Sequence, residues 1–280
     1  MKTKKYINVY VLQIYMIELT PELAEICGIH AGDGYLRKRK TGKIELDITG
    51  NVEEKEYYDK HVIPLINKFF NLNLKGKFYT KGTYGFVSTN TQFHILNKLD
   101  FPFGKKSLIV RVPKLILRSK DKLIYSMFLR GLLDTDGHIG FQNRRTLKNY
   151  SFFKRNYNYY PLICIGTVSQ KLSEGVCFML NELEIGHFVY NFQPKKTKYR
   201  NNSYRYMIII SGVERLLKWM NLIGSKNSVK FSRYLVWKKH GHCPTNLTLQ
   251  QRENILKGKL DINTIGSYVN GSTIRFRPEK

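Results

Sequence analysis

The chain has 280 residues, enough for one large domain or two small ones with a real hydrophobic core. It carries 47 Lys and Arg against 21 Asp and Glu, a formal charge of +26, and 42% of its residues are hydrophobic. This composition excludes a disordered basic tail protein, and no apolar run approaches the roughly 20 residues that span a membrane. The charge favours a polyanionic partner, nucleic acid first and an anionic membrane surface second.

The excess of positive charge extends over the whole chain. Residues 1–140 hold 23 basic and 14 acidic residues, a net +9, and residues 141–280 hold 24 and 7, a net +17. Two basic halves suit a ligand that runs the length of the protein better than one anionic pocket. The four cysteines are scattered without a C-x-x-C pair, so neither a disulfide framework nor a zinc site is indicated. We therefore expect an intracellular protein, cytoplasmic or, in a eukaryote, organellar.

Two sets of elements are predicted along the chain, in the same order. The first set opens with a helix capped by Thr20, with Pro21 at its first position; the second opens with a helix capped near Ser119 that runs through 121–133. The order αββαββα, twice, predicts an α+β fold with antiparallel sheets. The later elements are expected as a strand at 43–49, a helix at 53–70, a hairpin at 77–87 and a helix at 92–99, then a strand at 162–168, a helix at 171–183, a hairpin at 188–211 and a helix at 213–220.

These two sets define the expected domain organisation. Residues 1–118 form a first half with an N-terminal extension, residues 119–240 form a second half, and residues 241–280 form a C-terminal extension. Within that extension, Thr248 and Gln251 have the spacing of a capping box that opens one more helix.

A repeated motif closes the opening helix of each half. Residues 26–34 (ICGIHAGDG) align without a gap with residues 129–137 (LRGLLDTDG), and both end in Asp-Gly. Gly28 and Gly32 lie four residues apart on one helix face, and Gly131 and Thr135 occupy the same places in the second copy. Small residues at this spacing let two helices pack closely, so we expect the motif helices to meet, with a flexible glycine ending each of them.

That packing would place Asp33 and Asp136 side by side. Two carboxylates at adjacent helix C-termini repel each other unless cations neutralise them. Mg²⁺ suits such a site because it needs only one or two carboxylates besides water and phosphate oxygens. A single AGDG is an ordinary helix end and turn, and recurrence at the same place in both halves is what favours catalysis. Metal ions there would promote hydrolysis of a phosphodiester bond.

Both motifs resemble the signature of the LAGLIDADG homing endonucleases, in the single-chain form with two motifs. The second copy is a close match, whereas His30 and Ala31 depart from the pattern in the first. The resemblance covers about residues 18–240 and implies two pseudo-symmetric halves packed through their motif helices. It also implies that the last Asp of each motif binds divalent metal with the carbonyl of the residue before it, here Gly32 and Thr135. Mg²⁺ is the expected cofactor, and Mn²⁺ and Ca²⁺ are expected to fit the same site.

The resemblance implies further polar and basic side chains around the metals. Gln170 and Lys171 fit one such role in the second half, with Glu54 and Lys55 opposite them. A second role falls to the lysines near the end of each half, Lys106 and Lys230, with Lys105 and Lys226 as close competitors.

The family reads DNA with its antiparallel sheets, which lie in the major groove, so alternate strand residues are expected to face the bases. Residues 149–160 hold four Tyr and two Phe, and either stack on bases at a flank of the site or pack over the sheet edge. The expected DNA-binding residues are Arg37, Arg39, Lys43, Lys77, Tyr79 and Lys81 in the first half, and Arg144, Arg145, Lys196, Lys198, Arg200 and Arg205 in the second, with Glu45, Asp47, Lys195 and Tyr204 as further candidates.

The sequence therefore predicts a monomeric, Mg²⁺-dependent endonuclease that cuts both strands of a long double-stranded DNA site. The resemblance implies short 3′ overhangs and a mobile intron as the encoding element. Two alternatives stay open: an RNA maturase that binds its intron RNA, and a regulator of the same fold that binds DNA without cutting it.

Overall fold

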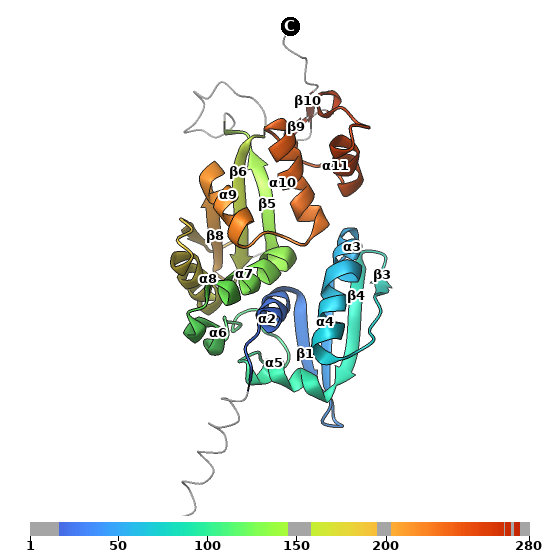
Figure 1. Ribbon diagram of the computed structural model, residues 1–280, viewed down its shortest axis with the longest axis vertical. Helices are drawn as coiled ribbons and strands as arrows, with labels where there is room; N and C mark the ends of the chain where they lie inside the picture. The colour runs from blue at the N-terminus through green and yellow to red at the C-terminus, as the bar shows by residue number, and fades with distance from the viewer. Residues whose placement is uncertain (1–16, 145–157, 195–202, 266, 270–271, 275–280) are drawn as a thin grey trace, which may run out of the picture.

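The computed structural model describes residues 17–144, 158–194, 203–265, 267–269 and 272–274. Two four-stranded antiparallel sheets dominate it, with strand orders β1-β2-β4-β3 and β5-β6-β8-β7 (Figure 1). The predicted α+β class and the antiparallel sheets are confirmed. The strands are β1 (Gly34–Lys38), β2 (Ile44–Asn51), β3 (Lys77–Thr80), β4 (Thr83–Asn90), β5 (Gly137–Gln142), β6 (Tyr160–Thr167), β7 (Phe188–Phe192) and β8 (Arg205–Ser211), with a short pair, β9 (Ser267–Val269) and β10 (Ser272–Ile274), near the C-terminus.

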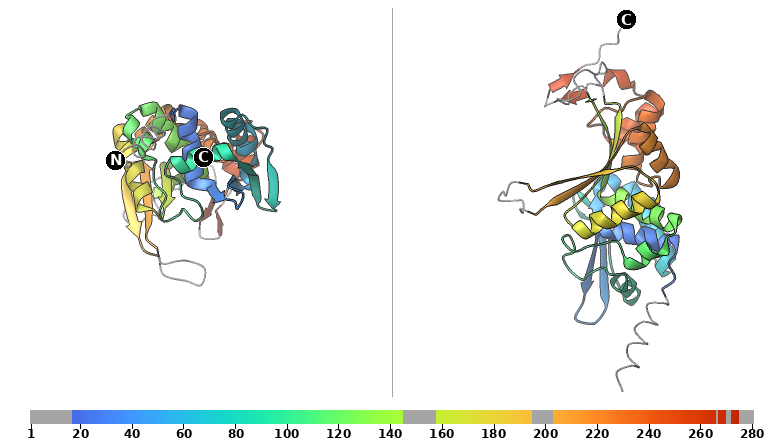
Figure 2. Two further views of the ribbon diagram at one scale, coloured as in Figure 1. Left: turned by 90° about the horizontal axis from the view of Figure 1, so that it is seen from below. Right: turned by 90° about the vertical axis from the view of Figure 1, so that its left-hand side faces the viewer.

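The helices gather toward one side of the molecule and the two sheets toward the other (Figure 2). In each half the helices and strands follow the predicted order αββαββα. None of the described helices is long and apolar enough to cross a membrane. The helices are α2 (Pro21–Asp33), α3 (Lys55–Tyr57), α4 (Ile63–Phe70), α5 (His94–Lys98), α6 (Lys114–Ser119), α7 (Lys122–Asp136), α8 (Gln170–Glu182), α9 (Val213–Leu222), α10 (Ser228–His240) and α11 (Leu249–Leu256), with short turns at Val52–Glu54 (η1), Tyr58–Val62 (η2), Thr91–Phe93 (η3) and Ile262–Thr264 (η6).

Strand alternation divides each sheet into a buried face and an open face. In β2, Ile44, Leu46 and Ile48 are buried, and in β6, Ile163 and Ile165 are buried. These side chains pack under the helices, which leaves the residues between them on the opposite face. One face of each sheet is therefore available to a partner.

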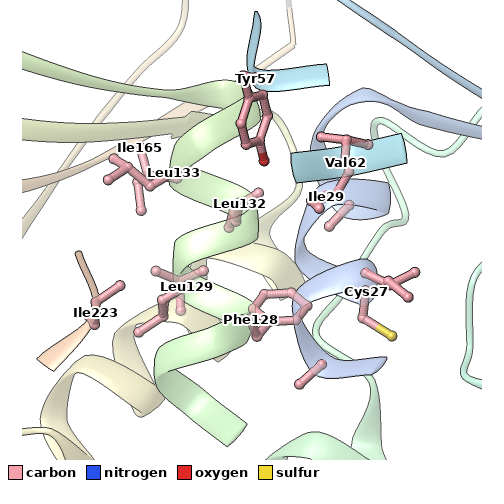
Figure 3. Packing of buried hydrophobic residues seen from close by; sticks show 14 of the residues in the cluster. Cys27, Ile29, Tyr57, Val62, Phe128, Leu129, Leu132, Leu133, Ile165 and Ile223 are labelled. Carbon is pink, nitrogen blue, oxygen red and sulfur yellow. The ribbon is translucent and has the colours of Figure 1, made fainter. Parts of the chain in front are cut away.

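The two motif helices, α2 and α7, pack directly on each other at the centre of the molecule, with Phe128 and Leu132 of α7 near Cys27 and Ile29 of α2 (Figure 3). A Cβ on Gly28 would lie 2.1 Å from the carbonyl oxygen of Phe128, closer than atoms can approach. The glycines therefore permit this backbone contact, as the motif spacing predicts.

The opening of the second half differs from the prediction. The helix does not start near Ser119, because Ser119 ends α6 and Lys120 adopts a left-handed conformation with φ 53°. Asp121 caps α7 instead, accepting hydrogen bonds from the backbone N–H groups of Leu123 and Ile124. In the first half, Thr20 caps α2 with Pro21 at its start, as predicted.

The glycines that end the motif helices do not act as flexible left-handed caps. Gly34 and Gly137 are both extended, with φ −79° and −88°, and each begins a strand. A Cβ on Gly34 would lie 2.0 Å from Nδ1 of His30. The reason for glycine here is therefore space for the preceding helical turn rather than backbone freedom.

A buried ion cluster joins α2 to α7 and to the helical segment after β2. The carboxylate of Glu25, 3% exposed, accepts two hydrogen bonds from Arg130, at 2.8 and 2.6 Å, and bonds His61 at 2.8 Å. Burial alone raises the pKa of Glu25, but the bonds from His61 and Arg130 outweigh it and lower the pKa to about 2. The cluster therefore needs an ionised Glu25.

We expect Glu25→Gln to destabilise the protein by about 3 kcal/mol at neutral pH, because it leaves Arg130 buried without its counter-charge. The folded pKa lies below the ordinary value, so the ionised carboxylate contributes stability above pH ~4.5 that is lost as the pH falls toward about 2. Urea unfolding at pH 7, 5 and 3 measures this. The difference in the free energy of unfolding between wild type and variant must narrow as the pH falls. A constant difference would contradict a stabilising role for the ionised Glu25.

Candidate active site

The ends of the two motif helices bring Asp33 and Asp136 together. A Cβ on Gly32 would lie 3.4 Å from the carboxyl carbon of Asp136, which places the second acid against the last turn of α2. Asp33 is half-buried and Asp136 is open to solvent. The pairing expected from the repeat is present, and the two acids stand in different surroundings.

Asp33 lies among groups of both signs. Tyr58 donates a hydrogen bond to its Oδ2 at 2.8 Å. Burial, helped by the charges of Asp136 and Glu54, raises the pKa of Asp33 to about 6 against the lowering effects of Tyr58 and Lys230. We call Asp33, Tyr58, Glu54 and Lys230 the Asp33 centre.

Asp136 faces a cavity of about 460 Å³ whose wall includes Lys106, His138 and Arg205. Desolvation raises the pKa of Asp136, and the charges of Lys106 and Lys230 oppose the rise. Desolvation also lowers the pKa of His138 to about 4, helped by Arg233 and Lys230, so this imidazole is neutral near pH 7. Asp136, Lys106 and His138 make up the Asp136 centre.

Two lysines bind the carbonyl groups at the ends of the motif helices. Nζ of Lys106 donates to the carbonyl oxygen of Gly32 at 2.7 Å. Nζ of Lys230 donates to the carbonyl oxygens of Leu133, Asp134 and Thr135 at 2.9, 2.8 and 2.6 Å. Burial lowers the pKa of both lysines, while the nearby acids oppose the shift. The two lysines that the resemblance implied, Lys106 and Lys230, therefore both lie at the helix ends that carry the paired acids.

The residues at these ends fit a divalent cation. Two neighbouring carboxylates, each with a raised pKa, present negative charge whose mutual repulsion a cation would relieve. Asp33 and Asp136 would hold it, with the carbonyl oxygens of Gly32 and Thr135 as further donors, since a carbonyl has a second lone pair beside its lysine bond. Within the described ranges no group of three or more His, Cys, Asp or Glu forms a closed metal site. The two carboxylates and two carbonyl oxygens named above leave coordination positions for phosphate and water.

The structure does not bring Gln170, Lys171 and Lys55 to the acids. Gln170 is the first residue of α8 and donates to Glu174 one turn later at 2.8 Å, and Lys171 is exposed beside it. Lys55 pairs with Asp59 in the same way on its own helix. For Gln170 and Lys55, a partner four residues on holds the side chain along the helix.

The alternative lysines, Lys105 and Lys226, both have exposed side chains. Lys105 is exposed beside Lys106. Lys226 contributes its backbone N–H, which donates to Oδ2 of Asp134 at 2.7 Å, whereas its side chain is exposed.

Tyr58, His138 and Asn227 belong to the site although sequence reasoning missed them. Asn227 caps α10 and donates through Nδ2 to Oε1 of Glu54 and to the carbonyl oxygen of Asp134, both at 2.7 Å. Tyr58 lies four residues after Glu54, so helical spacing from that acid could have indicated it. Nothing local marks Asn227, because its partners come from two distant segments.

The expected DNA-binding residues lie on or beside the open faces of the sheets where they are described. Arg37 and Arg39 both pair with Glu45 across the β1–β2 hairpin. Arg205 starts β8 and lines the cavity at Asp136, and Arg144 lies over the ring of Tyr160. Lys43, Lys77, Tyr79 and Lys81 lie exposed in the first half, while Arg145, Lys195, Lys196, Lys198, Arg200 and residues 149–157 fall outside the described residues.

Residues 124–224 match the family model of the LAGLIDADG-like domain. The match includes the second motif, in agreement with the resemblance stated for it. The first half repeats the order of elements of the second half and the order of its strands, first-second-fourth-third. No curated protein sequence matches the chain significantly.

Solved structures of LAGLIDADG meganucleases are similar to the chain in outline. I-SmaMI bound to uncleaveable DNA is 14% identical over 88% of this chain and 99% of its own, with a TM-score of 0.48. I-AabMI bound to uncleaved DNA is 12% identical over 86% of this chain and 99% of its own, with a TM-score of 0.47. These values describe a distant likeness.

Proposed function

We propose that the protein is a homing endonuclease that makes a metal-dependent double-strand break in a long DNA target. The observation that carries the proposal is the pair of acids at the joined ends of α2 and α7, set between two basic halves. A regulator that only binds DNA has no need of two carboxylates with raised pKa values at this position.

Five residues of the site have defined roles in this reaction. Asp33 and Asp136 would hold Mg²⁺, which would supply Lewis-acid activation of the scissile phosphate. Lys106 and Lys230 place positive charge where the phosphate gains negative charge, and they fix the carbonyl groups they bind. Tyr58 orients the carboxylate of Asp33. The open faces of the two sheets bind the DNA on either side, and one monomer supplies both centres.

The product and the biological role follow the family pattern. We propose short 3′ overhangs, with one strand cut near each acid, and a role in intron mobility. The same basic surfaces would allow binding of intron RNA as a second activity.

Sequencing of new DNA ends tests the proposal. A randomised plasmid pool is incubated with the purified protein, with and without Mg²⁺, and all new ends are sequenced. Mg²⁺-dependent ends at one long recurring site with 3′ extensions are the expected result. No ends above background, from a protein that still binds nucleic acid, would instead favour the maturase or the regulator, and competition between structured RNA and duplex DNA would then separate these two.

Divalent metal should also stabilise the free protein. We expect about 10 mM MgCl₂ to raise the Tm by several degrees, since ligand at 100 times its Kd contributes about 2.7 kcal/mol to the folded state. The control is NaCl at equal ionic strength, together with a variant that carries both Asp33→Asn and Asp136→Asn. An equal Tm rise in that double variant would place the metal elsewhere.

A further inference from the structure

The C-terminal segment at residues 241–265 touches both halves beside the Asp33 centre. Its helix α11 packs on α10, which carries Lys230. At the start of α11, the backbone N–H of Leu249 donates to Oε1 of Glu53 at 3.1 Å, and Glu53 immediately precedes Glu54 of the first half. Thr248 and Gln251 form the predicted capping box, which begins α11 at Leu249. The segment therefore bridges the two sides of one centre.

Arg252 is the buried anchor of that bridge. Its side chain is 1% exposed, although a guanidinium is among the groups most costly to bury. Nε donates to Oγ of Ser232 at 2.8 Å, Nη2 donates to the carbonyl oxygen of Val229 at 3.1 Å, and Nη1 donates to the carbonyl oxygen of Leu247. Nη2 also lies 3.9 Å from Oε1 of Glu53.

Two of these contacts flank Lys230 on its own helical turn. Val229 directly precedes Lys230 and Ser232 follows it by two residues, so Arg252 fixes the turn from which Lys230 reaches three carbonyl groups of α7. The Lys side chain is a flexible four-carbon chain, so the position of its ammonium depends on the position of its backbone. Fixing the backbone of this turn therefore helps to fix the ammonium of Lys230.

Lys106 of the Asp136 centre is supported within its own segment: its carbonyl oxygen accepts hydrogen bonds from the backbone N–H groups of Ile109 and Val110 at 2.9 and 2.7 Å, and Oγ of Ser169 donates to the carbonyl oxygen of Val110 at 2.5 Å. Lys106 lies in the irregular segment before α6, and Leu108 and Ile109, two and three residues later, are 63% and 58% exposed.

Nζ of Lys230 lies 3.8 Å from Oε1 of Glu54 in the Asp33 centre, whereas Lys106 lines the cavity at Asp136. Each lysine also binds the carbonyl group next to the other acid, Lys230 at Thr135 and Lys106 at Gly32. Of the described segments that carry these two lysines, Arg252 contacts only the turn of Lys230.

We propose that Arg252 is a positioning residue for Lys230, through which the C-terminal segment supports cleavage of the DNA strand that depends on Lys230. This inference rests on the proposed function. Loss of Arg252 should convert the double-strand cutter into a strand-biased nicking enzyme.

Strand-specific nicking rates test the inference. The full-length wild type and its variants cut a supercoiled plasmid carrying the target, end-labelled fragments report each strand, and gel shift in Ca²⁺ reports binding. Lys230→Met and Lys106→Met first identify the strand that depends on each lysine. We expect Arg252→Met to slow the Lys230-dependent strand at least about 10-fold and to leave the other within about 2-fold, and Arg252→Lys to recover part of the loss.

Two further variants keep the test decisive. Lys259→Met removes one exposed positive charge from the same segment and should leave both rates unchanged. Ser232→Ala removes a single contact of Arg252 and carries the test if Arg252→Met does not fold; it should show the same strand bias in weaker form. An equal fall on both strands, or no change on either, would overturn the inference. A wild-type protein that cuts neither strand would overturn the proposed function and the inference with it.

Discussion

Replacing either Asp33 or Asp136 with Asn is expected to abolish double-strand cleavage while DNA binding persists. The amide keeps the shape of the side chain and removes the charge that holds the cation. We expect the strand cut at the altered centre to be hydrolysed about 10²–10³-fold more slowly. Formation of linear plasmid measures the double-strand break, and gel shift measures binding.

Unfolding would not account for this loss of cleavage. The pKa of Asp33 in the folded protein, about 6, lies above its ordinary value of 3.8, so ionisation at pH 7 destabilises the folded state. Asp33→Asn removes that cost and should leave the free protein at least as stable. Asp121→Asn is the matched control, because it changes an acid at the far end of α7 where Asn also caps a helix. Full double-strand cutting by either active-site variant would refute the assignment.

Adding one methyl group between the motif helices is expected to lower the stability of the protein strongly. A Cβ on Gly131 would lie 2.4 Å from the carbonyl oxygen of Glu25 and 2.8 Å from the backbone nitrogen of Ile29. Both are backbone atoms, so α2 and α7 would have to move apart. We expect Gly131→Ala to lower the free energy of unfolding by about 3 kcal/mol, although alanine favours the helix by about 1 kcal/mol over glycine.

Urea unfolding of Gly131→Ala measures this cost. Gly82→Ala is the control, since nothing lies within 4 Å of a Cβ at that turn. Unchanged or increased stability of Gly131→Ala would mean that α2 and α7 do not pack as closely at Gly131 as the structure shows. Because both acids sit at the ends of these helices, we also expect the variant to cut DNA more slowly where it still folds.

Local patterns predicted the succession of helices and strands, because hydrophobic spacing and capping residues act within a few positions of each other. Thr20 and Thr248 cap the helices that their sequence contexts indicate. Two nearby candidates, Ser119 and Asp121, could both cap the second motif helix, and the left-handed turn at Lys120 decided between them. Sequence reasoning on Gly34 and Gly137 identified the helix ends and gave the wrong reason for glycine.

Part of the site was also readable from the chain. The repeat alone predicted that Asp33 and Asp136 meet, since small residues at equal spacing imply a close helix pair. The resemblance selected Lys106 and Lys230, whose bonds to the motif helices the structure describes. It also named Gln170, Lys171 and Lys55. The structure pairs Gln170 with Glu174 and Lys55 with Asp59, each one helical turn on, and the sequence context of these residues does not show that pairing in advance.

The sequence by itself determined the two-fold repeat, the α+β class, the basic surface and the pair of acids, all of which depend on spacing and composition. Only the tertiary structure decided which side chains surround each acid. Tyr58 donates a hydrogen bond to Asp33, which lies 25 positions earlier in the chain. Arg252 donates to the carbonyl oxygen of Val229, 23 positions earlier, in the turn that carries Lys230. Burial and charge at these groups arise from segments that are distant in the chain, so the unequal surroundings of two equivalent acids exist only once the chain has folded.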